Sequence, residues 1–291
     1  MGAVANVTEF GNAVTLSNTI AALGSPAFVK AVCMTNLVHG EDLPVNSMVK
    51  KFPKRGSLSA SYPLAEATAQ AIGSGGELTD TSADCTAAKA AIVSGLSVEA
   101  EQFSSMDLTR IAQEQFSAIA RAVDDDALGL ISGLSTGRTA SSLLTIDDIM
   151  LSQMGIYASE VPNKEVPLVL VTSAKGMYGV KKEIVQSGAS AWTSQSMLSI
   201  LGGRPQANCF VGSIPGLCDV YQTSGMGTSG SDTYSALFHP MWTFCGIFGA
   251  SPISWMARKG AEGFYTELAS YYFFDIAEWN DLAGRYILSD T

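Results

Sequence analysis

Histidine and charged side chains are scarce in this sequence of 291 residues. It contains two histidines, His39 and His239, and five cysteines that form no C-x-x-C pair. Zinc sites and Ser-His or Cys-His catalytic schemes need several such residues at fixed spacings, so few of them can form here. The phosphate-loop pattern G-x-x-x-x-G-K-[ST] does not occur either. We therefore expect no catalytic residues, no cofactor and no metal.

Charged residues make up 15% of the chain, compared with about 25% in ordinary soluble domains. The 17 basic and 27 acidic residues give a formal net charge of −10. This balance excludes a global phosphate-binding surface, because nonspecific affinity for nucleic acid comes from Lys and Arg. A monomer with so little charge would also be poorly soluble, so we infer that much of the surface contacts other protein.

Signal-peptide and membrane-spanning patterns are also lacking. The first residues, MGAVANVTEFGN, do not combine a basic region with an apolar one. The uncharged stretch 240–257 is interrupted by Pro240 and Pro252 and predicts short buried strands instead of a membrane span. The five scattered cysteines are expected to be reduced, buried thiols in a cytosolic product.

The residues that are present indicate a folded chain, since 47% are hydrophobic and 9% aromatic. Residues 1–46 are interrupted by Gly and Pro and predict an extended arm with short helical pieces and little core of its own. Residues 47–64 predict a basic two-stranded ribbon that turns near Arg55, and residues 72–86 predict a loop. Period-two alternation over residues 88–102 predicts one long strand.

Helical periodicity begins at Asp107 and predicts a rod about 39 Å long that ends near Gly133. A second helix is expected to begin at Thr145, and residues 166–188 predict a buried strand followed by a helix. From about residue 200 to 263, short apolar runs separated by turns predict sheet. The last 28 residues predict an aromatic strand paired with a final strand, RYILSD, across an Asn-Asp turn.

One glycine-rich motif could bind a phosphate. Residues 225–230 form a literal G-x-G-x-x-G, the pattern in which backbone amides approach a pyrophosphate. No convincing helix follows it, and after Asp232 no acidic residue occurs until Glu262. We therefore favour a surface loop, and keep an oligomeric α/β enzyme that binds a phosphate-bearing ligand there as the alternative hypothesis.

Two charged clusters are candidates for contacts between subunits. Three consecutive aspartates on the long helix point about 100° apart, so they cannot converge on one metal ion without other ligands. The basic ribbon residues match such an acidic face on a neighbouring subunit better than they match long DNA. The residues expected at these contacts are Lys50, Lys51, Lys54, Arg55, Asp124, Asp125 and Asp126.

The order of arm, basic ribbon, loop, long strand, long helix, mixed region and terminal aromatic strand resembles the major capsid protein of tailed double-stranded-DNA bacteriophages, which has the Hong Kong 97-type fold. Residues 76–133 resemble the family's passage from an extended loop, through a peripheral strand, into its spine helix. The ending AEWNDLAGRYILSDT resembles its last peripheral strands. The resemblance covers most of the chain as an order of elements, although no short invariant motif marks the family.

The resemblance implies an α+β fold in which residues 1–46 form an N-terminal arm and residues 47–86 an extended β-hairpin loop. Residues 87–160 and 264–291 would form the peripheral domain, and residues 161–263 the axial domain. It further implies hexamers and pentamers that close into an icosahedral head around the genome. Expected partners are portal and scaffolding proteins, decoration proteins in some relatives, and packaged DNA without sequence specificity. The expected location is the virion, assembled in the host cytoplasm, and an encapsulin-like compartment would share the fold.

Overall fold

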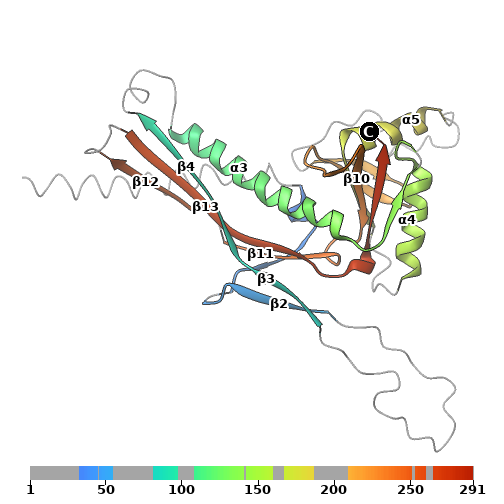
Figure 1. The fold of residues 1–291 in the computed structure, drawn as a ribbon, viewed down its shortest axis with the longest axis horizontal. Helices are drawn as coiled ribbons and strands as arrows, with labels where there is room; N and C mark the ends of the chain where they lie inside the picture. The colour runs from blue at the N-terminus through green and yellow to red at the C-terminus, as the bar shows by residue number, and fades with distance from the viewer. Residues whose placement is uncertain are drawn as a thin grey trace, which may run out of the picture.

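The structure is a computed structural model that describes residues 33–44, 46–54, 81–97, 108–140, 142–159, 167–186, 209–250, 253–259 and 265–290. These residues form an α+β fold with two large sheets and a two-stranded ribbon (Figure 1). The strands are β1 (His39–Asp42), β2 (Val49–Lys54), β3 (Thr81–Thr86), β4 (Ala88–Ser97), β5 (Gly137–Thr139), β6 (Leu168–Thr172), β7 (Phe210–Ile214), β8 (Cys218–Gln222), β9 (Thr228–Ser229), β10 (Asp232–Phe238), β11 (Phe244–Phe248), β12 (Ile253–Lys259), β13 (Tyr265–Glu278) and β14 (Gly284–Asp290). The helices are α3 (Leu108–Gly129), α4 (Ile146–Ala158) and α5 (Ala174–Gln186), with short 3-10 helices η1 (Met34–Asn36), η2 (Leu130–Gly133) and η3 (Asp281–Ala283).

The first sheet has the order β1-β11-β13-β12, and β4 also pairs with β13. The two longest strands, β4 and β13, run antiparallel in a register that extends from Ser97 opposite Tyr265 to Ala88 opposite Phe274. The predicted alternation in β4 is confirmed, because Ile92 is half-buried whereas the neighbouring Val93 is 64% exposed. Helix α3 runs along these two strands (Figure 1).

Helix α3 confirms the predicted rod, although it is shorter than expected. Its 22 residues span about 33 Å at 1.5 Å per residue. The helix ends at Gly129, and η2 continues the chain in a tighter turn to Gly133. Gln115, which is buried, fixes the helix to β13: its Nε2 donates to the Leu268 carbonyl at 3.0 Å, and its Oε1 accepts from Ser270 Oγ at 2.6 Å.

The second sheet has the order β5-β14-β10-β6-β8-β7, and β9 pairs with β10. Helix α4 begins after Thr145, as predicted. The Thr145 hydroxyl accepts from the Asp148 amide at 3.2 Å, and the Asp148 carboxylate accepts from the Thr145 amide at 3.3 Å. This capping box satisfies amide groups that the first helical turn leaves free.

The hydrophobic core is continuous through β6, which is buried at all five positions. Leu168 and Leu170 belong to the cluster formed with α4 and α5, and Val169 and Val171 belong to the cluster formed with α3. Burial on both faces explains the uninterrupted apolar run in this segment. Residues 33–44, expected as the end of an arm with little core, also contribute Met34, Leu37 and Val38 to the α3 cluster.

Two predicted strand pairings are wrong. β2 pairs with β3, from Val49 opposite Thr86 to Lys54 opposite Thr81, so the ribbon does not lie within residues 47–64 and part of the predicted loop 72–86 is a strand. The predicted turn at Arg55 lies outside the described residues.

The pairing of the last strand also differs from the prediction. β14 does not return along β13: it pairs with β10 and β5 in the second sheet. The Asn280 side chain caps η3 by accepting from the Leu282 amide at 3.2 Å, and this turn carries the chain from one sheet to the other.

Sheet membership also crosses the predicted domain boundary near residue 263. β11 and β12, expected in the axial domain, pair with β13, and β14, expected in the peripheral domain, pairs with β10. The assignment of the sheets to peripheral and axial parts of a shell subunit stays a prediction. The stretch 240–257 contains β11 and part of β12, which confirms the interpretation as short strands. Among the helices that the structure describes, none combines the length and apolar character needed to cross a membrane.

Candidate subunit-contact surfaces

The ribbon formed by β2 and β3 has one packed face and one exposed face. Phe52 and Cys85 lie on the packed face and belong to a cluster with Cys245 and Ile247 of β11. On the opposite face, Val49 is 42% exposed, and Met48, which precedes the strand, is 50% exposed. Because strand side chains alternate, neighbouring basic residues in the sequence point to different faces. An exposed face that carries apolar as well as charged side chains is suited to contact with another protein.

The predicted basic cluster is divided by this alternation. Lys50, opposite Cys85, lies at the rim of the packed face and pairs with Glu41, and its ammonium group holds the pKa of that carboxyl below the usual value. Lys51 lies on the exposed face, with its Nζ 3.6 Å from Asp84 Oδ2. Lys54 ends β2, and Arg55 lies outside the described residues. The cluster in the sequence is therefore not a single basic patch in the described part of the ribbon.

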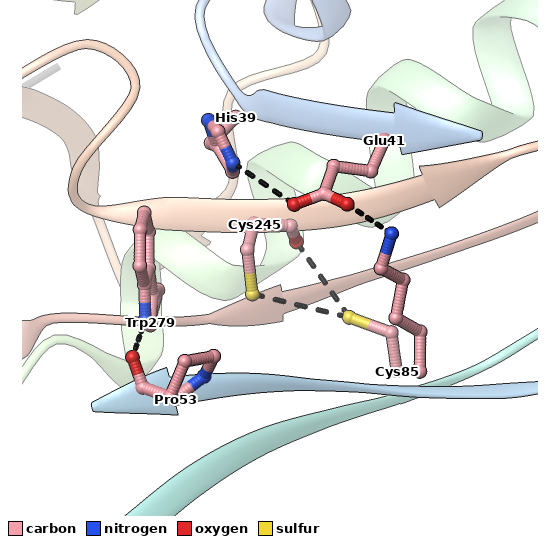
Figure 2. A network of polar contacts seen from close by, with 7 residues as sticks. His39, Glu41, Pro53, Cys85, Cys245 and Trp279 are labelled. Atoms are coloured by element: carbon pink, nitrogen blue, oxygen red, sulfur yellow. Dashed lines mark hydrogen bonds and ion pairs between the residues drawn. The ribbon is translucent and has the colours of Figure 1, made fainter. Parts of the chain in front are cut away.

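An aromatic stack fixes the ribbon to the first sheet near Pro53, at the end of β2 (Figure 2). The His39 ring stacks on Trp279 with centroids 5.1 Å apart, and Trp279 stacks on Trp242 at 5.6 Å with an interplanar angle of 2°. Trp279 Nε1 donates to the Pro53 carbonyl at 3.2 Å. His39 Nε2 also lies 3.4 Å from Glu41 Oε1, so the histidine connects the stack to the Lys50 ion pair. The sequence analysis missed this stack, because the residues are up to 240 positions apart and no local pattern connects them.

The three consecutive aspartates have different environments. Asp124 is buried, and its Oδ1 accepts from the amides of Cys33 at 2.9 Å and Met34 at 2.6 Å. Burial raises its pKa despite these two hydrogen bonds. Asp125 and Asp126 are exposed. The carboxyl group of Asp126 is nevertheless partly shielded from water, and this desolvation, together with the nearby charge of Asp275, raises its pKa. A contact between subunits stays a prediction for all seven charged residues, and Asp124 has a structural role within the chain.

The glycine loop does not form a phosphate cradle. Residues 225–230 lead into the β9–β10 hairpin and not into a helix, so the helix N-terminus that would bind a pyrophosphate is not there. A Cβ added at Gly225 would lie 2.7 Å from Asp125 Oδ1, which places an acidic side chain beside the loop. Both features disfavour an anion. A neighbouring cavity of about 680 Å³ is lined by both acidic and basic side chains, including Asp124, Asp125 and Arg121.

Residues 133–137 match the G-x-S-x-G pattern of hydrolase nucleophiles, which reasoning from the sequence had wrongly taken to be absent. In hydrolases this serine stands on a sharp turn between a strand and a helix. Ser135 instead lies between η2 and the edge strand β5, and its hydroxyl donates to the Asp281 carboxylate while its amide donates to the same side chain at 2.6 Å. The serine therefore holds η2 against η3. Within the described ranges, no group of three or more His, Cys, Asp or Glu side chains is placed to hold a metal.

Comparison with solved structures identifies the fold. The chain matches a protein of Mycobacterium phage Che8 with a TM-score of 0.66 and 15% identity, covering 88% of this chain and 90% of that one. It matches the capsid of Ralstonia phage GP4 with a TM-score of 0.63 and 12% identity, covering 88% and 87%. It also matches the SrpI encapsulin of Synechococcus elongatus with a TM-score of 0.56 and 11% identity, covering 92% and 89%.

No protein-family model and no curated protein matches the sequence. The structural matches extend across the whole chain and establish the Hong Kong 97-type fold, as the sequence predicted.

Proposed function

We propose that this chain is the major capsid protein of a tailed double-stranded-DNA bacteriophage, a structural subunit that assembles as hexamers and pentamers into an icosahedral head. The observation that carries the proposal is mutual coverage: the chain and the capsid chains it resembles each match over about nine-tenths of their length. A shared fold alone does not fix a function. Coverage of this kind adds that the sequence spans about the same length as the shell subunits that it matches.

The shape of the subunit supports the same proposal. The sheet containing β4 and β13 extends far beyond the compact second sheet, with α3 along it (Figure 1). The ribbon packs one face against β11 of this sheet and leaves its other face exposed. A two-stranded ribbon is marginally stable alone, so contact with neighbours would stabilise it. The low content of charged residues, 15%, is consistent with a surface that neighbouring subunits enclose.

The proposal includes partners and location. The subunit would contact copies of itself, portal and scaffolding proteins, and in some cases decoration proteins, in a virion assembled in the host cytoplasm. Packaged DNA would be enclosed without sequence specificity, and the net charge of −10 is unsuited to a continuous surface that grips its phosphates. Lys51, Asp125 and Asp126 are exposed and available for contacts between subunits, whereas Lys50 would have to contact a neighbour from the rim of the ribbon.

Electron microscopy of the purified protein, with or without a coexpressed scaffolding protein, tests this function. We expect closed shells tens of nanometres across. Small oligomers whose melting temperature rises with added nucleotide would favour the alternative enzyme hypothesis, and would contradict the shell. The geometry of the glycine loop already disfavours that alternative.

A second candidate is an encapsulin-like compartment, which the match to the SrpI encapsulin supports. The contents of the purified shells distinguish the encapsulin-like compartment from the phage head. Particles that copurify with a specific cargo protein would favour the compartment, whereas particles that package DNA in the presence of a portal would favour the phage head.

A further inference from the structure

Two buried thiols face each other where the ribbon packs on the first sheet (Figure 2). Cys85 of β3 and Cys245 of β11 have their Sγ atoms 3.9 Å apart. Cys85 Sγ also approaches the Cys245 carbonyl at 3.9 Å, and Cys245 Sγ approaches the Ala277 carbonyl at 3.7 Å. The two residues are 160 positions apart, so only the fold brings them together.

The two sulfur atoms are close enough to form a disulfide bond after a small movement. A disulfide requires about 2.05 Å between sulfur atoms, so each sulfur has to move by roughly 1 Å. The ribbon can supply this movement, because two strands held by a small apolar cluster open more easily than the centre of a large sheet. Around the pair, the cluster consists of apolar side chains such as Phe52 and Ile247.

We propose that Cys85 and Cys245 are a thiol–disulfide pair, which exchange with a small-molecule disulfide closes into a covalent link between the ribbon and β11. In a reducing compartment both residues remain thiols, as predicted from the sequence, and the link forms after transfer to an oxidising medium. The pair lies beside Lys50, which is opposite Cys85 in the ribbon, but the proposed chemistry uses only the two sulfur atoms.

The exchange is balanced with oxidised glutathione as the reagent. The Cys85 thiol loses its proton and its sulfur attacks one sulfur of glutathione disulfide, which gives a mixed disulfide and one glutathione thiol that takes up the proton. Cys245 then loses its proton and attacks the Cys85 sulfur, which releases the second glutathione as a thiol. Two protein thiols are oxidised, and one small disulfide is reduced to two thiols.

The electrostatics of the pair agree with this order. A hydrogen bond from Cys245 lowers the pKa of Cys85, and donation of that hydrogen bond, together with burial, raises the pKa of Cys245. Cys85 is therefore the thiol that ionises first, and the ionised form is the nucleophile.

The consequence of the link depends on the proposed function, although its formation does not. A bond between Cys85 of β3 and Cys245 of β11 fixes the ribbon to the first sheet. The two strands of this ribbon flank residues 55–80. In a shell, this bond would hold the ribbon in the position in which it meets a neighbour. Particles exposed to an oxidising medium would then resist disassembly better than reduced ones.

The test uses the full chain, purified reduced and then incubated with oxidised glutathione, with and without a urea concentration below the unfolding transition. Remaining thiols are alkylated, and the digested protein is analysed by mass spectrometry. We expect two of the five thiols to become protected and a linked peptide to join Cys85 to Cys245. The intact mass would fall by about 2 Da, the two hydrogens lost. Subdenaturing urea would accelerate the reaction by opening the ribbon.

Variants and a second thiol pair provide the controls. Cys85→Ala and Cys245→Ala each abolish the linked peptide, whereas Cys218→Ala, which alters a buried thiol of another core cluster, leaves it unchanged. Cys33 and Cys209 also influence each other's pKa, and this second pair of thiols serves as an internal comparison. A protein that stays reduced with and without urea, that stops at the glutathione adduct, or that links only Cys33 to Cys209 overturns the proposal. Electron micrographs of the same samples report separately on whether shells form.

Discussion

The amide of Met34 donates a hydrogen bond to the carboxylate of Asp124 at 2.6 Å, across ninety positions of sequence. Cys33 donates its amide to the same oxygen at 2.9 Å. Both amides lie at the start of η1, where the first turn has no internal acceptor for them. Asp124 therefore caps η1 from a distant helix, and fixes the segment that precedes the ribbon to α3.

Replacement of Asp124 is expected to destabilise the subunit. Asp124→Ala leaves two amides without their acceptor at a buried position, which costs about 1–3 kcal/mol of unfolding free energy. Asp124→Asn keeps one oxygen acceptor and costs less. Urea unfolding measures both, with the exposed Asp125→Ala as the matched control, for which a change within about 0.5 kcal/mol is expected. Equal losses at the two positions would contradict a capping role for Asp124.

The subunit is expected to become less stable as pH rises from mildly acidic to neutral. Burial raises the pKa values of Asp124, Asp126, Asp219 and Glu278 in the folded state. Within that window the folded state binds more protons than the unfolded state, so unfolding free energy falls as these groups ionise. The loss begins above the ordinary aspartate value of 3.8 and is complete above the raised pKa values.

Urea unfolding at about pH 5 and about pH 7 tests this sign. Asp126→Asn removes one of the groups while leaving the buried Asp124 intact, so the variant would lose less stability between the two pH values than the native chain. A chain that gains stability toward neutral pH, with or without the substitution, would disprove the assignment.

Two glycines are predicted to respond in opposite directions to alanine. Gly137 of β5 lies opposite Tyr286, and an added Cβ would come within 1.9 Å of the Tyr286 ring. Gly137→Ala therefore forces the ring or the edge strand to move and costs about 1–3 kcal/mol. Gly129 ends α3 with helical dihedrals and open space around it, so Gly129→Ala is expected to stabilise by about 0.5–1 kcal/mol. Thermal unfolding compares the two, and the same sign for both would refute the packing argument.

Local patterns predicted the elements, and distant contacts determined how they assemble. The alternation in β4, the capping residue Thr145 and the apolar run of β6 each depend on neighbours in sequence, and the structure confirms all three. Pairing of β2 with β3 and the transfer of β14 to the second sheet depend on partners that no local pattern specifies.

The candidate contact residues show the same limit. Consecutive aspartates suggested one acidic face, yet the helix turns Asp124 inward, where two amides compensate part of the cost of its burial. The adjacent lysines suggested one basic face, yet the strand places Lys50 and Lys51 on opposite sides. A run of like charges in a sequence predicts a surface patch only once the period of the element and its buried side are known.

Gln115 is expected to be coupled energetically to Ser270. Gln115→Leu keeps the volume but leaves the Leu268 carbonyl and the Ser270 hydroxyl without this partner inside the α3–β13 interface, at a cost of about 1–3 kcal/mol. Ser270→Ala in the same background removes one of the two unpaired groups. The double variant would therefore lose less stability than the sum of the single variants, as a double-mutant cycle measures. Simple additivity would show that the two side chains do not act as a pair.

Charge reversal on the ribbon tests the proposed contact between subunits. Lys50→Glu with Lys51→Glu is expected to reduce the yield of closed particles by about tenfold or more, because like charges at an interface cost several kcal/mol. The fold would persist, since the pairs with Glu41 and Asp84 are partly exposed to solvent and contribute little to stability. Particle yield by sedimentation and subunit folding by circular dichroism separate these effects, with Lys182→Glu on the exposed side of α5 as a matched control.

A charge swap distinguishes a contact with a neighbour from the pair within the chain. Glu41→Lys combined with Lys50→Glu restores an ion pair at the rim of the ribbon but reverses the charge that Lys50 presents. If Lys50 contacts an acidic group of the next subunit, the swap remains defective in assembly even though the internal pair is present. Recovery of normal particles by the swap would show that Lys50 acts only within its own chain, and the contact between subunits would then depend on Lys51 and the exposed face alone.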